Sequence, residues 1–475
     1  MSARAFWSHA VQARAPAARY ALPVPAEARR ALSSAWMLLA LAALAASGVF
    51  AVLLVLSRAP AIKDVFPLVD FFHVALVVHV DLSVLVWFLA FAGTLWTLNS
   101  TPHAMGLGWG ALALALAGAA LMALAPFAGS GRPVMSNYIP VLDEPVFLAG
   151  LVAFGAGVAL AVARGMLAVP PVGVRLDGGA ALRFGLNTSL VSAGVALIAF
   201  AWSLARAPHG LDPRDYYGLA FWGGGHVLQF TYTLLMFVAW LCLAEAGGAP
   251  LPLTPRTAVL LFGIGLAAVF ATPVIYLAYD LGSVEYHRIL TWLMRFGGGL
   301  AIAPFALAVV IGLARAAPPS GEERTLRAAL AASLLLFGAG GLIGFAISGS
   351  NVKIPAHYHG CIVGVTLAFM GLAYHLLPRL GFGAVRPGPA TTQLWLYAAG
   401  QLLHIGGLVW SGGYGVQRKV AGAAEALHGA REIAAMGLMG FGGLIAVAGG
   451  LMFVVLAFGA VLRRRAPEPA VRARP

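Results

Sequence analysis

The sequence predicts an all-α integral membrane protein with about twelve transmembrane helices. Three observations support this class. Of the 475 residues, 61% are hydrophobic. Only 10% are charged, whereas soluble chains carry roughly 25% charged residues. Apolar runs of about 20 residues, the length that crosses a bilayer as a helix, recur along the whole chain. No soluble domain of this length could bury so much apolar surface.

Twelve apolar runs have the length of a membrane span, and no polar segment between them is long enough to separate two folded domains. We therefore expect one membrane domain over 32–462, flanked by basic tails at 1–31 and 463–475. The first tail has no cleavage-type apolar core, so it is interpreted as cytoplasmic and not as a signal peptide. The expected spans are 32–56, 68–97, 105–127, 141–163, 182–204, 217–244, 255–279, 288–313, 326–349, 355–377, 391–411 and 434–462.

The formal net charge of +13 is explained by membrane topology. If the N-terminus is inside, 19 of the 30 Lys and Arg residues fall on the inner side and 10 on the outer side, with Arg295 in a span. This is the positive-inside distribution. We expect a multi-pass protein of the inner (cytoplasmic) membrane, with both termini cytoplasmic, lipid around it and no nucleic-acid partner.

Four histidines share one depth in the expected bilayer. The second, sixth and tenth spans enter from the outer side, and His79, His226, His357 and His359 each lie in the first part of such a span. Ionisable residues inside membranes are costly and tend to be functional. A single one is more often a packing or proton-relay residue, but four in one layer indicate a binding site.

The two histidines of His357-Tyr358-His359 point to opposite sides of the tenth span. Two positions correspond to about 200° around a helix. The imidazoles therefore cannot share one metal, but each can hold a separate haem, because haem iron takes axial imidazole readily.

At these residues the chain resembles the catalytic subunit (subunit I) of the haem-copper oxidase superfamily, closest to the B-type oxidases and the nitric oxide reductases derived from them. The His-x-His, the stretch from His79 to Trp87 and the run Phe221-Trp222-Gly-Gly-Gly-His226 are similar to the family's motifs and follow in the same order. The resemblance implies the twelve-helix subunit I fold and two haems. It assigns the low-spin haem to His79 (in preference to His73) and His359, the high-spin haem to His357, and the haem propionates to Arg418 and Lys419.

The chain departs from the family where oxygen-reducing members carry a cross-linked tyrosine, four residues after the sixth-span histidine. Phe230 occupies this position, beside Gln229, and Tyr232 follows two residues later. Phenylalanine has no phenol to donate a proton and an electron to an O–O bond. Gln229 and Tyr232 are the candidate polar groups of the active site.

A second departure concerns the second active-site metal, normally copper. In the family His226 would be joined by a histidine pair in the seventh span, but Leu277 and Ala278 occupy those positions. A mixed nitrogen–oxygen site, which suits non-haem iron better than cuprous copper, and the absence of any second metal remain open alternatives. The further donors near this end are His287, Tyr276, Tyr279, Asp280 and Glu285.

These departures favour reduction of nitric oxide, because two NO molecules need only two electrons and two protons to give N₂O and water. A terminal oxygen reductase, a degenerate haem-binding member without catalysis and a secondary transporter are the alternatives. There is no binuclear copper motif and no Cys-x-x-Cys-His. The expected electron donor is therefore a partner subunit or a soluble cytochrome or cupredoxin on the outer face.

Overall fold

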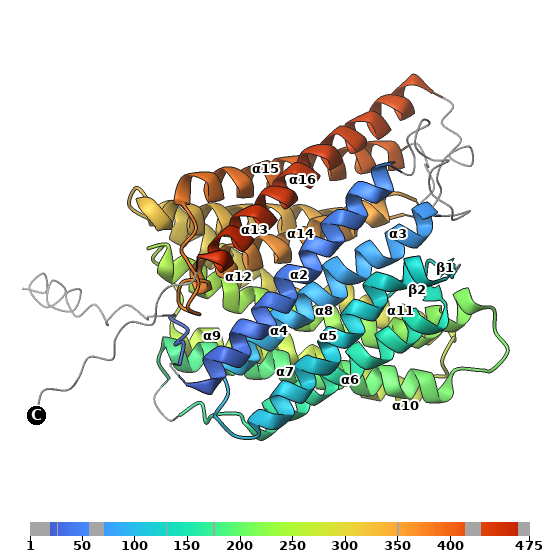
Figure 1. Ribbon diagram of the computed structural model, residues 1–475, viewed down its shortest axis with the longest axis horizontal. Coiled ribbons are helices and arrows are strands. Elements are labelled where there is room, and N and C mark those ends of the chain that lie inside the picture. The colour runs from blue at the N-terminus through green and yellow to red at the C-terminus, as the bar shows by residue number, and fades with distance from the viewer. Residues whose placement is uncertain are drawn as a thin grey trace, which may run out of the picture.

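Long helices running side by side make up almost the whole molecule (Figure 1). The computed structural model describes residues 20–25, 27–56, 71–129, 131–173, 176–348, 351–413 and 429–463. Within these ranges, eleven helices are long and apolar enough to cross a membrane. The chain is a multi-pass membrane protein, and the all-α class with twelve helices overall is confirmed.

Each expected span corresponds to a helix or to two helices in succession. The first six are α2 (Ala28–Leu56), α3 (Phe71–Val80) with η2 (Asp81–Val86) and α4 (Trp87–Leu98), α5 (Met105–Ala128), α6 (Pro145–Leu167), α7 (Gly178–Arg206) and α8 (Pro213–Ala246). The last six are α9 (Pro255–Ala267) with η3 (Ala268–Phe270) and α10 (Ala271–Ala278), α11 (Val284–Gly297) with α12 (Gly299–Arg315), α13 (Gly321–Phe345), α14 (Lys353–Leu376), α15 (Pro387–Gly412) and α16 (Ala430–Leu462).

Two spans are interrupted for reasons visible in the sequence. Pro273 lacks the N–H that would continue the α-helical ladder, and the tighter 3₁₀ turn η3 lies just before α10. In the next span α11 ends at Gly297 and α12 begins at Gly299, with Gly298 between them. Three successive glycines favour a break, because glycine loses most backbone freedom in a helix.

The eleventh expected span, 391–411, lies within α15. This helix has 26 residues and no charged side chain. It is nevertheless not one of the eleven helices that are apolar enough by composition to cross a membrane. Gln393, Gln401 and His404 lower its mean hydropathy. It packs along α16, which supplies the apolar surroundings that its own sequence lacks.

A short antiparallel hairpin joins α5 to α6. Strands β1 (Arg132–Val134) and β2 (Val141–Asp143) pair with Val134 opposite Val141. The fourth span was expected from residue 141, but its helix begins at Pro145. Glu144 fixes this start, since its carboxylate accepts hydrogen bonds from Val146 N at 3.0 Å and Phe147 N at 2.9 Å.

The hairpin and the start of α3 lie at the same end of the bundle, at the right in Figure 1. We call this the hairpin end. Arg132 of β1 forms an ion pair at 3.6 Å with Asp212, the residue that precedes α8. Gly412, at the close of α15, lies against Lys353, so α14 also begins at this end.

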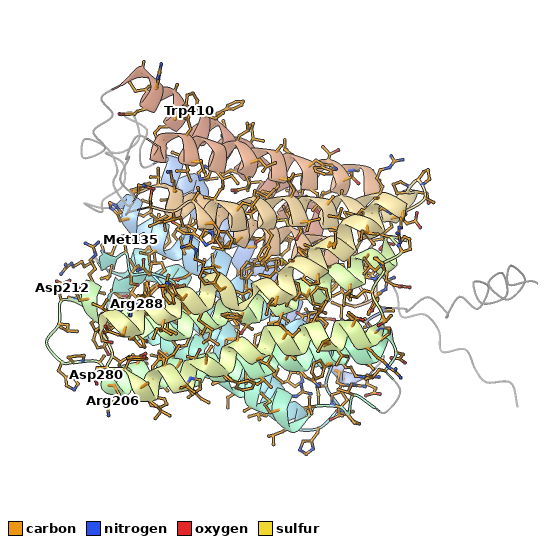
Figure 2. All side chains as sticks on the ribbon, turned by 180° about the vertical axis from the view of Figure 1, so that it is seen from behind. Met135, Arg206, Asp212, Asp280, Arg288 and Trp410 are labelled. Carbon is orange, nitrogen blue, oxygen red and sulfur yellow. The ribbon has the colours of Figure 1, made fainter. Side chains whose placement is uncertain are left out.

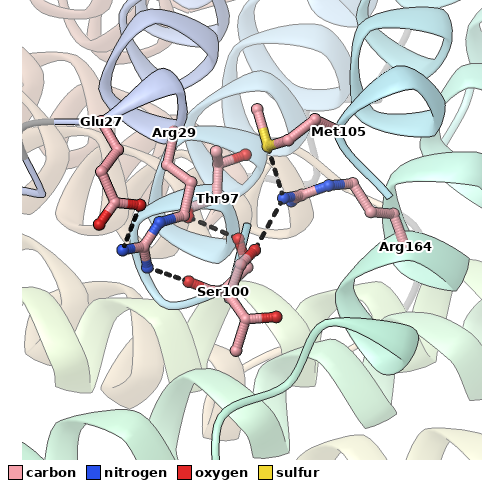
Figure 3. Close-up of polar contacts among 7 residues, drawn as sticks. Glu27, Arg29, Thr97, Ser100, Met105 and Arg164 are labelled. Carbon is pink, nitrogen blue, oxygen red and sulfur yellow. Dashed lines mark hydrogen bonds and ion pairs between the residues drawn. The ribbon is translucent and has the colours of Figure 1, made fainter. Parts of the chain in front are cut away.

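A polar cluster joins three helices at the other end (Figure 3). Arg29 of α2 donates to Ser100 O, after α4, and pairs with Glu27 at 3.2 Å. Arg164, in the last turn of α6, donates to Thr101 O at 3.2 Å. The two guanidinium groups thereby satisfy backbone carbonyls of the turn that follows α4.

Helices α13 and α14 cross at glycines, where their backbones nearly touch. A Cβ on Gly340 would lie 2.4 Å from Cys361 N, and one on Gly360 would lie 2.5 Å from the Cα of Gly340. Such small-residue contacts are the usual means of close helix approach in membranes. The contact sets the position of His357 and His359, which lie in the same turn of α14.

We predict that Gly340→Ala lowers the free energy of unfolding by about 1–3 kcal/mol, because its methyl group meets backbone and not a movable side chain. Gly338→Ala is the matched control. Its Cβ would have no neighbour within 4 Å, so the better helix propensity of alanine should leave stability unchanged or raised. Melting temperatures in detergent measure both. Equal melting temperatures would contradict the role of this contact.

Candidate functional site

His79 is held where α3 widens into the π-helical turn η2. Its Nδ1 donates to Ser47 O on α2 at 2.9 Å. The carbonyl of His79 accepts the hydroxyls of Ser83 at 2.7 Å and Ser47 at 3.0 Å. π-Turns occur frequently at functional sites. Here the turn frees a carbonyl, and two serines satisfy it.

His359 faces α15, and its Nδ1 donates to Pro355 O at 2.8 Å. The ring of His404 on α15 lies with its centroid 5.0 Å from that of His359, tilted by 51°. His404 itself donates from Nδ1 to Met439 O at 3.0 Å. His79 and His359 also interact electrostatically.

His357 faces the other side of α14. Its Nδ1 donates to Gly340 O on α13 at 2.7 Å. The missing side chain of Gly344 makes room for the ring, since a Cβ there would lie 2.7 Å from Nδ1. The expectation that His357 and His359 point to opposite sides of their helix is confirmed by these contacts with α13 and α15.

The three histidines share one hydrogen-bonding scheme that fits them to bind haem iron. Each donates Nδ1–H to a backbone carbonyl, which assigns the tautomer whose Nε2 carries the free lone pair. A second observation agrees for the low-spin haem. Both carboxyl oxygens of Asp81, two residues beyond His79, are buried and lack a hydrogen-bond partner among the described residues. Buried polar atoms of this kind point to a polar group beyond the described residues.

His226 has the same Nδ1 arrangement, with Trp222 O as acceptor at 2.7 Å. Its Nε2, however, lies 2.9 Å from the hydroxyl of Tyr138. Tyr138 comes from the hairpin loop, between β1 and β2, and its ring centroid lies 4.8 Å from that of His226. Burial raises the pKa of Tyr138 above its ordinary value, so the phenol stays protonated and donates to Nε2.

Sequence reasoning did not identify Tyr138. The signal that could have indicated it is the glycine run before His226, because three adjacent glycines in a buried helix leave space for other side chains. A Cβ on Gly223 would lie within 2.4 Å of the Tyr276 hydroxyl. A Cβ on Gly224 would lie as close to the ring of Phe200, and a Cβ on Gly225 as close to the ring of Tyr138. Each glycine of the run therefore admits an aromatic ring.

His287 interacts with His226 electrostatically but forms no hydrogen bond with it among the described residues. The indole of Trp222 contacts both imidazoles, with centroid distances of 4.8 Å to His226 and 4.9 Å to His287. The Nδ1 of His287 is bonded to Ser283 O at 3.0 Å. With Trp222 it lines an open cleft of about 440 Å³, which also includes Arg288, labelled at the hairpin end in Figure 2.

The oxygen donors of the seventh and eighth spans lie apart from His226. Tyr276 is buried, and its hydroxyl is bonded to Ser203 Oγ at 2.8 Å and Tyr286 Oη at 3.0 Å. Exposed positions hold Tyr279, Asp280 and Glu285, and Figure 2 shows Asp280 at the edge of the molecule. Across the described ranges, no three His, Cys, Asp or Glu residues are placed to hold a metal ion.

The two polar candidates of α8 occupy different faces from Phe230. Gln229 is half-buried one turn from His226. Tyr232 packs edge-on against Phe88 of α4, with ring centroids 4.7 Å apart. It follows His226 by six residues, which is about 9 Å along the helix axis. Phe230 lies against the Gly297 position. Arg418 and Lys419, the expected propionate ligands, fall outside the described residues.

Comparison with known proteins identifies the architecture. No family model matches the chain. It is 28% identical over 501 residues to the uncharacterized protein RP382 of Rickettsia prowazekii, covering 90% of this chain and 95% of that protein. An uncharacterized protein of Aquifex aeolicus is 28% identical over 351 residues, covering 73% and 85%. A cryo-electron microscopy structure of a haem-copper terminal oxidase dimer superposes with a TM-score of 0.71, covering 94% of this chain and 86% of that one at 17% identity.

The fold is that of a haem-copper terminal oxidase. The resemblance that the motifs indicated is thereby confirmed for the architecture. In this haem-copper oxidase fold the second, sixth and tenth spans are α3–α4, α8 and α14, which carry His79, His226 and the His357–His359 pair. Phe230 lies on α8, and Leu277 and Ala278 lie on α10 of this fold.

We predict that Tyr276→Phe lowers stability by about 1–3 kcal/mol without changing metal content, because it leaves the buried hydroxyls of Ser203 and Tyr286 without this partner. Tyr279→Phe is the control, since Tyr279 is 37% exposed and should stay within about 0.5 kcal/mol. Melting temperature and elemental analysis measure the two effects. Loss of a non-haem metal from Tyr276→Phe would show that Tyr276 is a ligand.

Proposed function

We propose that the protein is the haem-containing catalytic subunit of a respiratory gas reductase in the inner membrane, which reduces nitric oxide to N₂O. The observation that carries this proposal is the set of three histidines, His79, His357 and His359. Their Nδ1 atoms are bonded to backbone carbonyls, and their Nε2 atoms have no hydrogen-bond partner among the described residues. The haem-copper oxidase fold supports it.

In the proposed assignment His79 and His359 hold the low-spin haem, and His357 holds the high-spin haem. When bound, the haems supply one-electron transfer and a site for the gas. The chain fixes the axial imidazoles, excludes bulk water with the apolar surfaces of α4, α8 and α14, and places His226 in the same layer. Arg418 and Lys419 are the proposed partners of the haem propionates.

The choice of nitric oxide over oxygen follows from the residues around His226. The position of the family's cross-linked tyrosine is Phe230, and Tyr232 packs against Phe88 instead of lying beside His226. The reaction 2 NO + 2 e⁻ + 2 H⁺ → N₂O + H₂O needs no tyrosine-derived electron. Oxygen reduction is the second candidate, favoured because the similar solved structure is named a terminal oxidase.

Electrons enter from a donor subunit, a soluble cytochrome or a cupredoxin at the hairpin end, which we propose to be the outer face with both termini cytoplasmic. All candidate haem ligands lie in the first part of helices that begin at this end. A donor there would have the shorter path to the haems.

The proposal is tested by haem and metal analysis of the purified protein, followed by NO and O₂ consumption on the same sample. We expect two haems per chain and NO turnover that exceeds O₂ turnover. Faster O₂ turnover would establish the oxidase alternative. Two haems without turnover of either gas would indicate a degenerate member, and the absence of a Soret band would exclude haem function altogether.

We predict that His359→Ala removes the low-spin haem and leaves the high-spin haem, because one of two axial imidazoles is lost while His357 keeps its bond to Gly340 O. His73→Ala, a change of the other second-span histidine, should retain both haems. Pyridine haemochrome analysis and the low-spin absorption bands measure the result. Retention of the low-spin haem in His359→Ala would overturn the ligand assignment.

A further inference from the structure

The Nε2 atom of His226 already has a partner within the chain. A ligand of a second metal must offer this nitrogen, because Nδ1 is bonded to Trp222 O. Yet Nε2 lies 2.9 Å from Tyr138 Oη, a normal hydrogen-bond distance. Trp222 lies between His226 and His287. His226 is thus enclosed by two aromatic rings, and among the described residues no three His, Cys, Asp or Glu side chains are grouped to hold a metal ion.

The backbone of the hairpin loop is strained at Tyr138 in a way that serves this contact. Tyr138 has φ +70°, in the left-handed region that bulky side chains rarely adopt. Ile139 N donates to Asn137 O at 2.9 Å, which makes Tyr138 the central residue of a positive-φ γ-turn, a rare and strained conformation. The Ser136 hydroxyl closes the same loop by donating to Ile139 O. Such strain persists only where its surroundings require it.

Helix α8 is shaped to receive the ring. A Cβ on Gly225 would lie 2.3 Å from Cγ of Tyr138, so only glycine allows the ring to lie this close to the helix. The edge of the ring meets Trp222 at a centroid distance of 5.9 Å and an angle of 78°, a favourable aromatic geometry. The hydrogen bond, the loop strain and the glycine are three separate features that place one phenol on one nitrogen.

We infer that Tyr138, and not a metal ion, is the permanent partner of His226, so that haem iron is the only metal of the gas site. This inference rests on the proposed function and makes it more specific. Tyr138 is then a positioning residue that acts through His226. Tyr138 supplies a phenol to His226 from the hairpin loop, whereas α8 carries Phe230 at the position where a tyrosine could have done so.

The electron count of such a site matches nitric oxide and not oxygen. Two haems hold two electrons, the number consumed when two NO molecules and two protons form N₂O and H₂O. Complete reduction of one O₂ to water consumes four electrons and four protons. A site without a second metal would have to collect the other two from its donor during the reaction.

The first experiment measures metals and magnetism in the wild-type holoprotein. We expect iron equal to the haem content, no copper, and the axial EPR signal of an uncoupled high-spin ferric haem. Copper or non-haem iron at one per chain, lost in His226→Ala while the haems remain, would overturn the inference. Haem content alone tests the proposed function, so a chain without haem and a chain with haem plus a second metal are distinguishable failures.

The second experiment compares Tyr138→Phe with Tyr217→Phe. The first change keeps the ring and removes only the hydroxyl on His226. Tyr217 stacks on Phe221 at 5.7 Å and, within the part of the chain that the structure describes, contacts neither His226 nor His287. We expect Tyr138→Phe to shift the infrared stretch of CO bound to the ferrous high-spin haem and to lower NO turnover about tenfold. Tyr217→Phe should change neither. An unchanged CO stretch in Tyr138→Phe would overturn the inference.

Discussion

The site depends on one interaction, the hydrogen bond from a histidine Nδ1 to a helix carbonyl. In a bilayer no water can satisfy a polar ring atom, so an imidazole on a span must find its partner within the protein. His79, His226, His357 and His359 all use a backbone carbonyl, on their own helix or on the next one. This leaves every Nε2 as the reactive nitrogen. Among the described residues, His226 is the one of the four whose Nε2 has a hydrogen-bond partner, the hydroxyl of Tyr138.

Glycine is the constraint that makes these bonds reachable. The carbonyl of Gly340 can accept from His357 because α13 and α14 approach to backbone contact. The glycines before His226 perform a different task, since they admit aromatic rings and not a helix. A side chain at Gly340 would meet the backbone of α14 beside His357, and one at Gly225 would meet the ring of Tyr138. Composition alone could not separate packing glycines from site glycines, because both are small residues in apolar helices.

Hydropathy was sufficient to predict the spans, because span length and apolarity are properties of single helices. Helix boundaries within a few residues of the expected ones, such as Ala28–Leu56 for 32–56, follow from the length of the apolar runs. The opposite directions of His357 and His359 follow from helix geometry. The 141–163 span started too early because Val141–Asp143 is apolar enough to extend a helix but pairs as a strand.

Contacts between distant segments could not be predicted in the same way. Tyr138 and His226 are 88 residues apart, and a loop tyrosine carries no periodic signal. The position of Trp222 between His226 and His287 depends on how α11 packs on α8, which the sequence does not encode locally. Likewise, Tyr276 and Tyr279 look equivalent along the chain. One is bonded to Ser203 and the other is exposed only because of the course of α10.

The π-helical turn from Asp81 to Val86 has a consequence for how this span can change over time. The wider turn rotates the side chains of α4 relative to those of α3. The direction of His79 on α3 is therefore set separately from that of Phe88 and Phe91 on α4. The rings of Phe88 and Phe91 contact Phe369 at centroid distances of 5.6 Å and 4.4 Å. A substitution in the aromatic layer can thus change the packing of α4 without rotating His79, so that the interior of the bundle can diverge in sequence while the hydrogen bonds of His79 are kept.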